Sequence, residues 1–332
     1  MSLDALGWNG QRQKEFAAID ADGLIPGRVI AEHRSHFRVA LEGAEISART
    51  SGRMRNTAKE RSDLPGVGDF VAVRLAVGDG PSTIDAVLPR TSALIRKASG
   101  ESQPQLLAAN IDVVFIMTAP DADLNLPRLE RYLTLVRSSG ATPVIVVNKA
   151  DLAHDAIEVT DRIASIAVGV PIHAVSARCR DPIPDLEQFF DGNRTVALVG
   201  SSGVGKSTLT NLLLGRAAQA TQEVRAHDSR GRHTTTHRQL FARPGGGSII
   251  DTPGMRALEA WHSPAEGGSS FKDIEALSAQ CKFSDCGHKS EPGCAVRAAV
   301  DRGELDAGRA DSYAAVARIE TERSVPQRAW RH

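Results

Sequence analysis

The sequence lacks any long hydrophobic run and any recognisable export signal. Its longest apolar runs, at residues 113–117 and 144–147, fall far short of the ~20 residues that a membrane-spanning helix needs. The first residues, MSLDALGWNGQRQKEF, contain no basic stretch followed by an apolar one and no cleavage site. We therefore expect neither a membrane protein nor a secreted one.

Cysteine is also scarce, with four in 332 residues, which is too few for a disulfide framework. Three of the four lie between residues 281 and 294, and this crowding favours a metal site in a reducing cytosol. With 41% hydrophobic and 24% charged residues, the composition excludes wholesale disorder and a fibrous repeat. At ~100–200 residues per domain, we expect a multi-domain cytoplasmic protein.

Net charge is absent as well, because 40 basic residues balance 40 acidic ones. The balance hides two clusters, at residues 49–61 and 225–243, each with five basic residues against one acidic residue. The first contains Arg49, Arg53, Arg55, Lys59 and Arg61. Such clusters can bind phosphate backbones whatever the overall charge, but they are also typical of solvated surface loops. Charge alone does not decide whether RNA is a partner.

Residues 27–90 have the pattern of short strands separated by glycine- and proline-rich turns. Strands are predicted at 28–30, 37–41, 70–75 and 82–88. Four or five short strands in so short a segment favour a small closed β-barrel. An OB-type barrel is the leading interpretation, although SH3-like barrels have much the same pattern.

From about residue 106 the pattern changes to strands that alternate with helices. Strands at 111–117, 143–147, 170–175 and 195–199 are separated by helical stretches near 127–137, 155–167 and 184–190. Nearly continuous apolar strands in this alternation predict a parallel sheet covered by helices on both faces. A glycine- and serine-rich stretch at 263–270, a cysteine–histidine cluster and a helical region at 304–322 follow.

A phosphate-binding motif stands between the strand at 195–199 and a predicted helix at 207–214. It matches G-x-x-x-x-G-K-[ST] with one more threonine and comprises Gly200, Ser201, Ser202, Gly203, Val204, Gly205, Lys206, Ser207 and Thr208. The glycines let backbone N–H groups turn toward the α- and β-phosphates at the positive end of the helix dipole. Lys206 should reach the β- and γ-phosphates, and the Ser207 hydroxyl should ligate Mg²⁺.

Further motifs at strand ends indicate which base is bound. Asn148, Lys149, Ala150 and Asp151 form N-K-x-D after the strand at 143–147, and this resembles the guanine-specificity motif of GTPases. A carboxylate can accept from both N1–H and the exocyclic amine of guanine, whereas adenine offers neither donor there. Ser176 and Ala177 follow the strand at 170–175 and resemble the loop whose backbone N–H meets guanine O6.

Asp251-Thr252-Pro253-Gly254 resembles the D-x-x-G switch, with Asp251 on Mg²⁺ and Gly254 sensing the γ-phosphate. Ordinary GTPases place the P-loop first, then the switch threonine, D-x-x-G, N-K-x-D and S-A. Here N-K-A-D and S-A precede the P-loop, the threonines at 234–236 and D-T-P-G. Because the termini of a domain often lie close together and tolerate permutation, the sheet can keep its arrangement. We predict a circularly permuted P-loop GTPase.

Three thiols and one imidazole lie within fourteen residues: Cys281, Cys286, His288 and Cys294. Cys₃His satisfies tetrahedral Zn²⁺, and four protein ligands leave no open position, so the predicted zinc site is structural. The alternative is a set of unrelated cytosolic thiols beside a surface histidine. Cys179 lies far from this cluster in the sequence.

A small barrel, a permuted GTPase core and C-x4-C-x-H-x5-C together resemble the RsgA (YjeQ) family of GTPases in bacterial small-ribosomal-subunit assembly. The most specific part is Gly231-Arg232-His233-Thr234-Thr235-Thr236, which is similar to the family's G-x-H-T-T-T switch. The resemblance implies binding to the small subunit and its rRNA late in maturation, with GTP hydrolysis to GDP and phosphate stimulated by the subunit. We expect Mg²⁺, one structural Zn²⁺, no membrane partner and a monomer.

The predicted division is an N-terminal extension at 1–26, an OB-type RNA-binding barrel at 27–90, a permuted GTPase domain at 91–262 and a zinc-binding, mostly helical domain at 263–332.

Many GTPases place a water-orienting glutamine directly after D-x-x-G, but here the residue is Met255. A thioether cannot orient water, so we expect slow hydrolysis by the protein alone.

His233 is the best substitute for that glutamine, and its alternative role is to contact phosphate or RNA. Thr235 is the favoured switch threonine on Mg²⁺, and Lys206 completes the predicted catalytic set. Two other functions stay open at this point. One is a P-loop kinase or ATPase, which Asp151 opposes, and the other is a zinc-stabilised RNA-binding module that uses GTP only as a structural or switch ligand.

Overall fold

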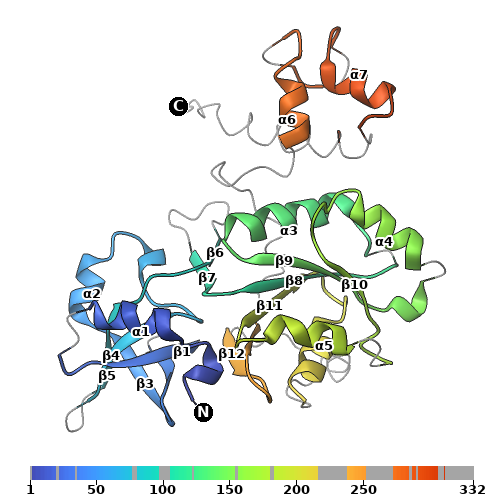
Figure 1. Ribbon diagram of the computed structural model, residues 1–332. Helices are drawn as coiled ribbons and strands as arrows, with labels where there is room; N and C mark the ends of the chain where they lie inside the picture. The colour runs from blue at the N-terminus through green and yellow to red at the C-terminus, as the bar shows by residue number, and fades with distance from the viewer. Residues whose placement is uncertain are drawn as a thin grey trace, which may run out of the picture.

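The structure is a computed structural model that describes residues 2–19, 22–33, 36–76, 81–96, 105–121, 123–153, 156–179, 183–215, 238–251, 272–283, 286–288, 291–305 and 310. Two groups of elements share one continuous sheet, a barrel near the N-terminus and an α/β part (Figure 1). No helix in the described ranges combines the length and the apolar character that crossing a bilayer requires. His233, Thr235, Gly254 and Met255 lie outside the described residues.

The barrel has five strands: β1 (Ile25–His33), β2 (His36–Leu41), β3 (Ala44–Thr50), β4 (Phe70–Arg74) and β5 (Ser82–Val87). They follow the order β1-β2-β3-β5-β4, and a β1–β4 pairing closes the barrel. The pairing of β3 with β5 is parallel, and the other pairings are antiparallel. Val29, Val39 and Val71 are fully buried inside it. The prediction of an OB-type closed barrel is confirmed.

Two short elements join β3 to β4, namely α2 (Gly52–Thr57) and the 3₁₀ helix η2 (Arg61–Asp63). Ser51 caps α2, because its hydroxyl accepts from the N–H of Met54 at 3.3 Å. The basic cluster at 49–61 thus occupies the end of β3, this helix and η2. It is held on the outside of the barrel rather than in an extended loop.

The α/β part has six strands in the order β10-β9-β8-β11-β13-β12. They are β8 (Val113–Thr118), β9 (Thr142–Val147), β10 (Ile172–Ala174), β11 (Thr195–Gly200), β12 (Gln239–Ala242) and β13 (Ser248–Asp251). All neighbours pair in parallel except β12 with β13. The P-loop strand β11 therefore lies at the centre, as the permuted order of motifs requires.

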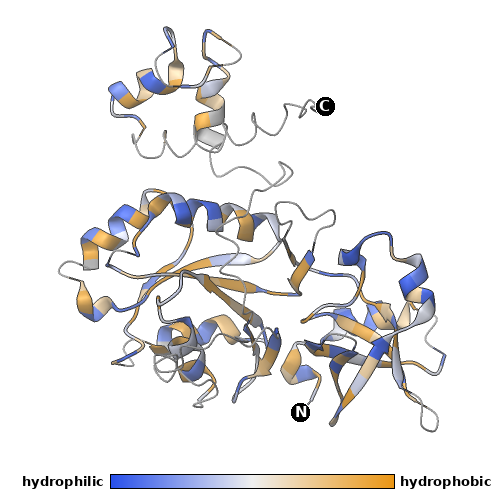
Figure 2. Cartoon of the chain, turned by 180° about the vertical axis from the view of Figure 1, so that it is seen from behind, coloured by the Kyte–Doolittle hydropathy of each residue, from blue (hydrophilic) through white to orange (hydrophobic). Residues whose placement is uncertain are grey.

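Helices cover both faces of this sheet (Figure 1). Alternate residues of β8 enter two different cores: Ile116 packs with Leu129 and Leu133, whereas Phe115 packs with Leu186 and Leu209. The first core lies under α3 (Leu126–Ser138) and α4 (Ala156–Ala164), and the second lies under η4 (Ile183–Phe190) and α5 (Lys206–Leu213). Apolar residues run along the central strands in Figure 2. The predicted doubly covered parallel sheet is confirmed.

The structure differs from the predicted elements in several places. The strand expected at 170–175 is reduced to three residues in β10, and the helix expected at 184–190 is the 3₁₀ helix η4. The sequence pattern did not predict β3, β12, or the hairpin of β6 (Ala93–Arg96) and β7 (Gln105–Ala109). β6, β7 and β12 have four or five residues each, and their pairing partners rather than their own periodicity make them strands. β3 has seven residues that alternate between apolar and polar side chains, a pattern that the sequence reasoning missed. The three boundaries between the four predicted segments stay a prediction.

The N-terminal segment packs against the barrel through η1 (Asp4–Leu6) and α1 (Gly10–Ala17). Asn9 caps α1 by accepting from the N–H groups of Gln11 and Arg12. Phe16 is buried with Phe70, and Trp8 meets the Phe70 ring edge-on at 5.7 Å between centroids.

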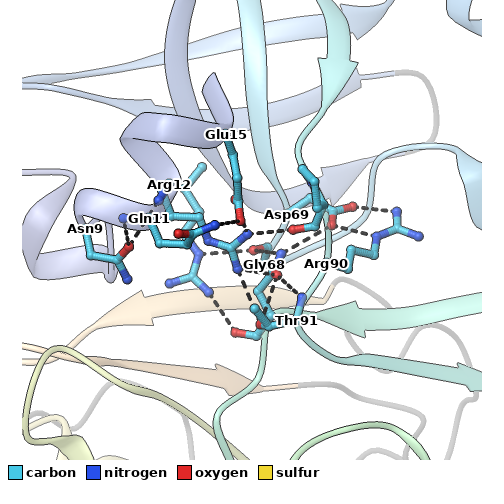
Figure 3. A network of polar contacts seen from close by, with 11 residues as sticks. Asn9, Gln11, Arg12, Glu15, Gly68, Asp69, Arg90 and Thr91 are labelled. Atoms are coloured by element: carbon cyan, nitrogen blue, oxygen red, sulfur yellow. Dashed lines mark hydrogen bonds and ion pairs between the residues drawn. The ribbon is translucent and has the colours of Figure 1, made fainter. Parts of the chain in front are cut away.

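A buried polar network fixes the barrel to the α/β part (Figure 3). Arg28 of β1 is 1% exposed, and its guanidinium donates to the carbonyls of Gly68 and Asn110, each at 3.1 Å. Its third acceptor is the carbonyl of Leu6. The Asn110 side chain in turn donates to the Gly68 carbonyl at 3.2 Å and accepts from Arg12 at 2.8 Å.

Asp69 is fully buried beside this network and forms a two-pronged ion pair with Arg90, at 2.7 and 2.8 Å. Burial raises the pKa of the Asp69 carboxyl, while the Arg90 guanidinium opposes that rise. Arg90 also donates to the carbonyls of Ser62 and Leu64, so it anchors the loop that follows η2.

The described C-terminal part consists of α6 (Lys272–Ser278) and α7 (Ala295–Asp301), which contact one another. Its core is small, with Ile274, Val296, Ala299 and Leu305 as buried apolar residues. So few buried side chains give little stability by themselves, and the cysteine–histidine cluster lies beside them.

We predict that Gly68→Ala destabilises the junction of the barrel and the α/β part. Gly68 has φ +94°, and a Cβ there would lie 2.1 Å from the carbonyl oxygen of Ala109. Strain and overlap together should cost about 3–4 kcal/mol and lower the melting temperature. Gly43→Ala is the matched control, because Gly43 has φ +74° with nothing within 4 Å of the added Cβ, and its cost should be about 1–2 kcal/mol. Equal melting temperatures for the two variants would contradict the prediction.

Candidate functional site: nucleotide-binding loops and a cysteine–histidine cluster

The P-loop turns from β11 into α5 through three glycines with positive φ, at +143° for Gly200, +84° for Gly203 and +99° for Gly205. A Cβ on Gly205 would lie 2.2 Å from the side-chain nitrogen of Asn148, so a side chain there would push the loop away from its neighbour. Gly205 is also the N-cap of α5 and offers no side-chain cap. The first N–H groups of the helix are left for an anion.

Lys206 begins α5, and its side chain curls back over the P-loop. The ammonium donates to the Gly200 carbonyl at 2.7 Å and also to the carbonyl of Ser201. These carbonyls hold the charge at the centre of the loop, where phosphates would bind. Ser202 and Gly203 of the loop and Ser207 and Thr208 of the first turn of α5 are exposed, whereas Val204 is buried.

Asn148 joins three loops at the carboxyl edge of the sheet. Its side-chain NH₂ donates to the Val204 carbonyl at 2.8 Å, and its side-chain oxygen accepts from the N–H of Ala177 at 3.1 Å. Asn148 is 3% exposed, so it positions the P-loop and the Ser176–Ala177 turn relative to one another. Both ends of its amide are satisfied within the protein.

Asp151 lies at the predicted base position in the 3₁₀ helix η3 (Ala150–Leu152). One carboxylate oxygen accepts from the Ser176 hydroxyl at 2.6 Å, and the residue is exposed. The N–H of Ala150 donates to the Val175 carbonyl at 3.0 Å, which links η3 to the end of β10. The geometry fixes the carboxylate and leaves room for donors from a base.

Lys149 has φ +60° and forms an ion pair with Asp121 at 3.1 Å. The pKa of the Asp121 carboxyl is lowered, chiefly by a hydrogen bond from the N–H of Asp123 and further by the Lys149 ammonium. Lys149 therefore spans from the N-K-A-D loop to the loop after β8. Asn148 thus links the predicted base loop to the predicted phosphate loop, and Lys149 links it to the loop after β8.

Asp251 ends β13, which runs beside β11 with Ala197 opposite Ile250. This register puts Asp251 at the same sheet edge as the P-loop, where a ligand of Mg²⁺ is expected. The structure thus brings together the P-loop, N-K-A-D, S-A and Asp251, four strand ends of one sheet.

Sequence reasoning missed one residue of this region, Asp123. Its carboxylate accepts from the hydroxyl of Ser201 in the P-loop and forms an ion pair with Arg128 of α3 at 2.7 Å. An acidic residue 78 positions from its partner carries no local pattern that could have identified it. It fixes the first turn of the P-loop from the opposite side to Asn148.

The cysteine–histidine cluster converges as the spacing predicts. The ligand atoms of Cys281, Cys286, His288 and Cys294 all lie within 4.8 Å of one another. The Sγ atoms of Cys281 and Cys294 are 3.9 Å apart, and the Nδ1 atom of His288 lies 3.6 and 3.5 Å from them. Such separations suit ligands about 2.0–2.3 Å from one central ion.

The surroundings of the cluster also fit a metal ion. The Nε2 atom of His288 lies 3.1 Å from the Ser278 hydroxyl, which orients the ring and leaves Nδ1 toward the cysteines. Burial raises the pKa of the Cys286 thiol to about 11, so the thiolate that binds zinc forms only with a cation beside it. Burial would raise the pKa of Cys281 too, but the N–H groups of Ala295 and Val296 lower it. The three cysteines and His288, whose ring is held by Ser278, fit one structural Zn²⁺.

The P-loop lies at the centre of a six-stranded sheet, and N-K-A-D and S-A come from earlier segments of the chain. This arrangement defines a circularly permuted P-loop GTPase. Residues 87–261 match the family model described as RsgA GTPase. The crystal structure of YjeQ from Thermotoga maritima superposes with a TM-score of 0.64 at 27% identity, covering 91% of this chain and all of that one. The circularly permuted GTPase YloQ gives a TM-score of 0.59 at 26% identity, covering 92% and 98%.

Curated relatives are more similar still. A protein of Opitutus terrae named small ribosomal subunit biogenesis GTPase RsgA is 44% identical over 323 residues, covering 94% of this chain and 88% of its own length. A protein of Methanosarcina acetivorans with the same name is 42% identical, covering 92% and 82%. The chain belongs to the RsgA GTPase family.

We predict that Asp151→Asn weakens GDP binding by about 10- to 100-fold, because two charge-assisted hydrogen bonds to the base are lost. Xanthosine diphosphate, which carries a carbonyl in place of the guanine amine, should bind the variant better than it binds the wild type. Fluorescent-nucleotide titration measures both affinities. Asp161→Asn makes the same substitution on the exposed side of α4 and serves as control. An unchanged guanine preference in Asp151→Asn would exclude the predicted base site.

We predict that Cys281→Ser releases the zinc ion and melts the part of the chain around α6 and α7, whose small core needs the metal. Elemental analysis measures the zinc content, and limited proteolysis detects the melting. Nucleotide binding should persist, because the P-loop packs in a separate core. Cys179→Ser is the control, since Cys179 is exposed and outside the cluster. Full zinc occupancy in Cys281→Ser would contradict the prediction.

Proposed function

We propose that this chain is a GTPase that acts in the late maturation of the small ribosomal subunit. It binds the subunit's rRNA and hydrolyses GTP to GDP and phosphate when the subunit stimulates it. The observation that carries the proposal is the agreement of the described part of the nucleotide site with relatives of that name along nearly the whole chain. Cytoplasmic location and a monomeric state belong to the same proposal.

The roles of the site residues follow from their placement. Asp151 binds the guanine N1–H and amine, and the loop of Ser176 and Ala177 meets O6 through its backbone. Asn148 accepts from the Ala177 N–H and holds these loops against the P-loop. Lys206 and the N–H groups from Gly203 to Thr208 bind the phosphates. Ser207 and Asp251 hold Mg²⁺, which neutralises charge on the β- and γ-phosphates when bound.

Lys206 has a second role as a catalytic residue, because it stabilises the charge that develops on the transferred phosphoryl group. The exchange of partners is simple, since its ammonium leaves the carbonyls of Gly200 and Ser201 for phosphate oxygens. Three further residues complete the proposed site. His233 orients the water, Thr235 binds Mg²⁺, and Gly254 contacts the γ-phosphate. These three lie outside the described residues.

RNA binding is assigned to the barrel and its basic cluster at 49–61. OB-type barrels bind oligonucleotides on the face of strands 2 and 3 and the adjoining loops. In this chain β3 leads directly into the basic cluster, so charge and binding face coincide. The zinc-bound C-terminal part supplies a second, separately folded surface for the same partner.

The test is GTP turnover by the zinc-loaded protein alone, with small subunits and with large subunits. We expect slow turnover alone and stimulation by about 10-fold or more with small subunits only, because a completed active site adds transition-state stabilisation. His233→Ala should remove the stimulation and leave GDP affinity unchanged. Turnover that neither subunit stimulates would overturn the proposal and favour an RNA-binding module that uses GTP as a switch ligand.

A further inference from the structure

A cavity of about 450 Å³ lies between the barrel and Arg238, the residue just before β12. None of its lining residues belongs to the nucleotide loops. Its walls include Arg49 of β3, Arg55 of α2, Arg61 of η2, Leu106 of β7, Glu32 of β1 and Arg238. We call it the basic groove. No motif of the sequence assigned a ligand to it, and the P-loop strand is separated from β12 by β13.

The basic groove has an excess of positive charge. Four guanidiniums face one carboxylate, and Arg49, Arg55 and Arg61 are exposed and take part in no ion pair within the described ranges. The two acidic residues nearest in sequence are engaged in their own turn. Asp63 accepts from the N–H groups of Lys59 and Glu60, and the Glu60 carboxylate accepts from the Ser62 hydroxyl at 3.2 Å. Such a cavity suits phosphate groups, which guanidiniums bind through paired hydrogen bonds.

The groove also carries flat surfaces beside the charge. His33 and His36 lie on its wall with their rings stacked, 5.0 Å between centroids and 25° between planes, and Phe37 follows them. Aromatic side chains next to a basic groove are typical of sites for single-stranded nucleic acid, because an unpaired base stacks on them.

Arg238 connects this groove to the nucleotide site. Its Nη1 atom donates to the Leu106 carbonyl at 2.9 Å and lies 3.5 Å from a carboxylate oxygen of Glu32. The next residue, Gln239, pairs with Ala31 of β1 on one side and with Asp251 of β13 on the other. One residue therefore separates the groove from the strand pair that carries the predicted Mg²⁺ ligand.

In the sequence, Arg238 stands three residues after Thr235 and five residues after His233, the predicted switch residues. Arg238, which lines the groove, and Gln239, which pairs with Asp251, therefore stand within four residues of Thr235 in the sequence. A ligand that changes the partner of Arg238 acts on the place where the switch joins the sheet.

We propose that the basic groove binds the phosphate backbone of single-stranded RNA and that Arg238 couples its occupancy to the nucleotide state. An RNA phosphate competes with Glu32 for the Arg238 guanidinium, and the change is transmitted through Gln239 to Asp251. Because such coupling is reciprocal, bound GTP or GDP changes RNA affinity by the same factor by which RNA changes nucleotide affinity. The proposal rests on the proposed function as an RNA-binding GTPase and adds the site and the route of regulation.

The first experiment locates the RNA. A fluorescein-labelled 12-nucleotide single-stranded RNA is titrated with the full-length, zinc-loaded protein by anisotropy at several salt concentrations. Arg55→Ala and Arg61→Ala should each weaken binding about fivefold or more and lower the slope of log affinity against log salt by about 1. Arg53→Ala is the matched control, because Arg53 lies on α2 but does not line the groove. Equal losses in Arg53→Ala and Arg55→Ala would overturn the assignment of the groove.

The second experiment measures the coupling. RNA affinity is compared with GDP and with a non-hydrolysable GTP analogue bound, and the wild type should show a ratio of about 5 or more. Glu32→Gln and Arg238→Gln should bring the ratio close to 1. Glu45→Gln is the control, because Glu45 pairs with Arg38 on the barrel outside the groove, and it should keep the wild-type ratio.

A wild-type ratio of 1, or an unchanged ratio in Glu32→Gln and Arg238→Gln, would overturn the coupling. Melting temperature and GDP affinity of every variant show that losses do not come from unfolding. Failure of the coupling proposal is distinguishable from failure of the proposed function, because the stimulation of GTP turnover by small subunits is measured separately with the wild type.

Discussion

The buried guanidinium of Arg28 is the interaction on which the arrangement of the molecule depends. Burial lowers the pKa of Arg28 to about 10, yet the group stays charged at neutral pH because the carbonyls of Leu6, Gly68 and Asn110 surround it. Burying such a charge is costly unless every donor has a partner. Those partners come from three segments, at Leu6, Gly68 and Asn110, so the network forms only when all three are in place.

Strand β1 connects the Arg28 network to the strands beside the nucleotide site. Arg28 lies within β1, Ala31 pairs with the first residue of β12, and Glu32 reaches Arg238. A rotation of the barrel would therefore break the Arg28 network and the β1–β12 pairing together. Because both are fixed, the barrel is part of the sheet that carries Asp251. Binding on the barrel can consequently influence the nucleotide loops without any rearrangement of whole domains.

Much of the site could be predicted from the sequence, because its chemistry is local. Lys206, Asp151 and the four zinc ligands each belong to short motifs whose spacing is set by one turn or one loop. The long-range hydrogen bonds that position the motifs and the barrel could not be predicted. Asp123 accepts from Ser201, 78 residues away, and Arg28 donates to Asn110, 82 residues away. A lone arginine in a strand or an aspartate in a loop has no periodicity that reveals its partner. The barrel was predictable from its turns, but β12, at four residues, is a strand because β1 and β13 lie on either side.

The permuted order of the chain gives this pairing a physical reason. In the six-stranded sheet β12 would be an edge strand, with a row of unpaired N–H and C=O groups beside the predicted switch. An exposed edge invites pairing with other chains. Here β1 covers part of that edge from within the same molecule. Because the barrel precedes the GTPase part in the sequence and joins it through Asn110, the strand that protects the edge also brings the basic cluster beside it. The protection of a sheet edge and the placement of an RNA-binding surface thus follow from one strand pairing.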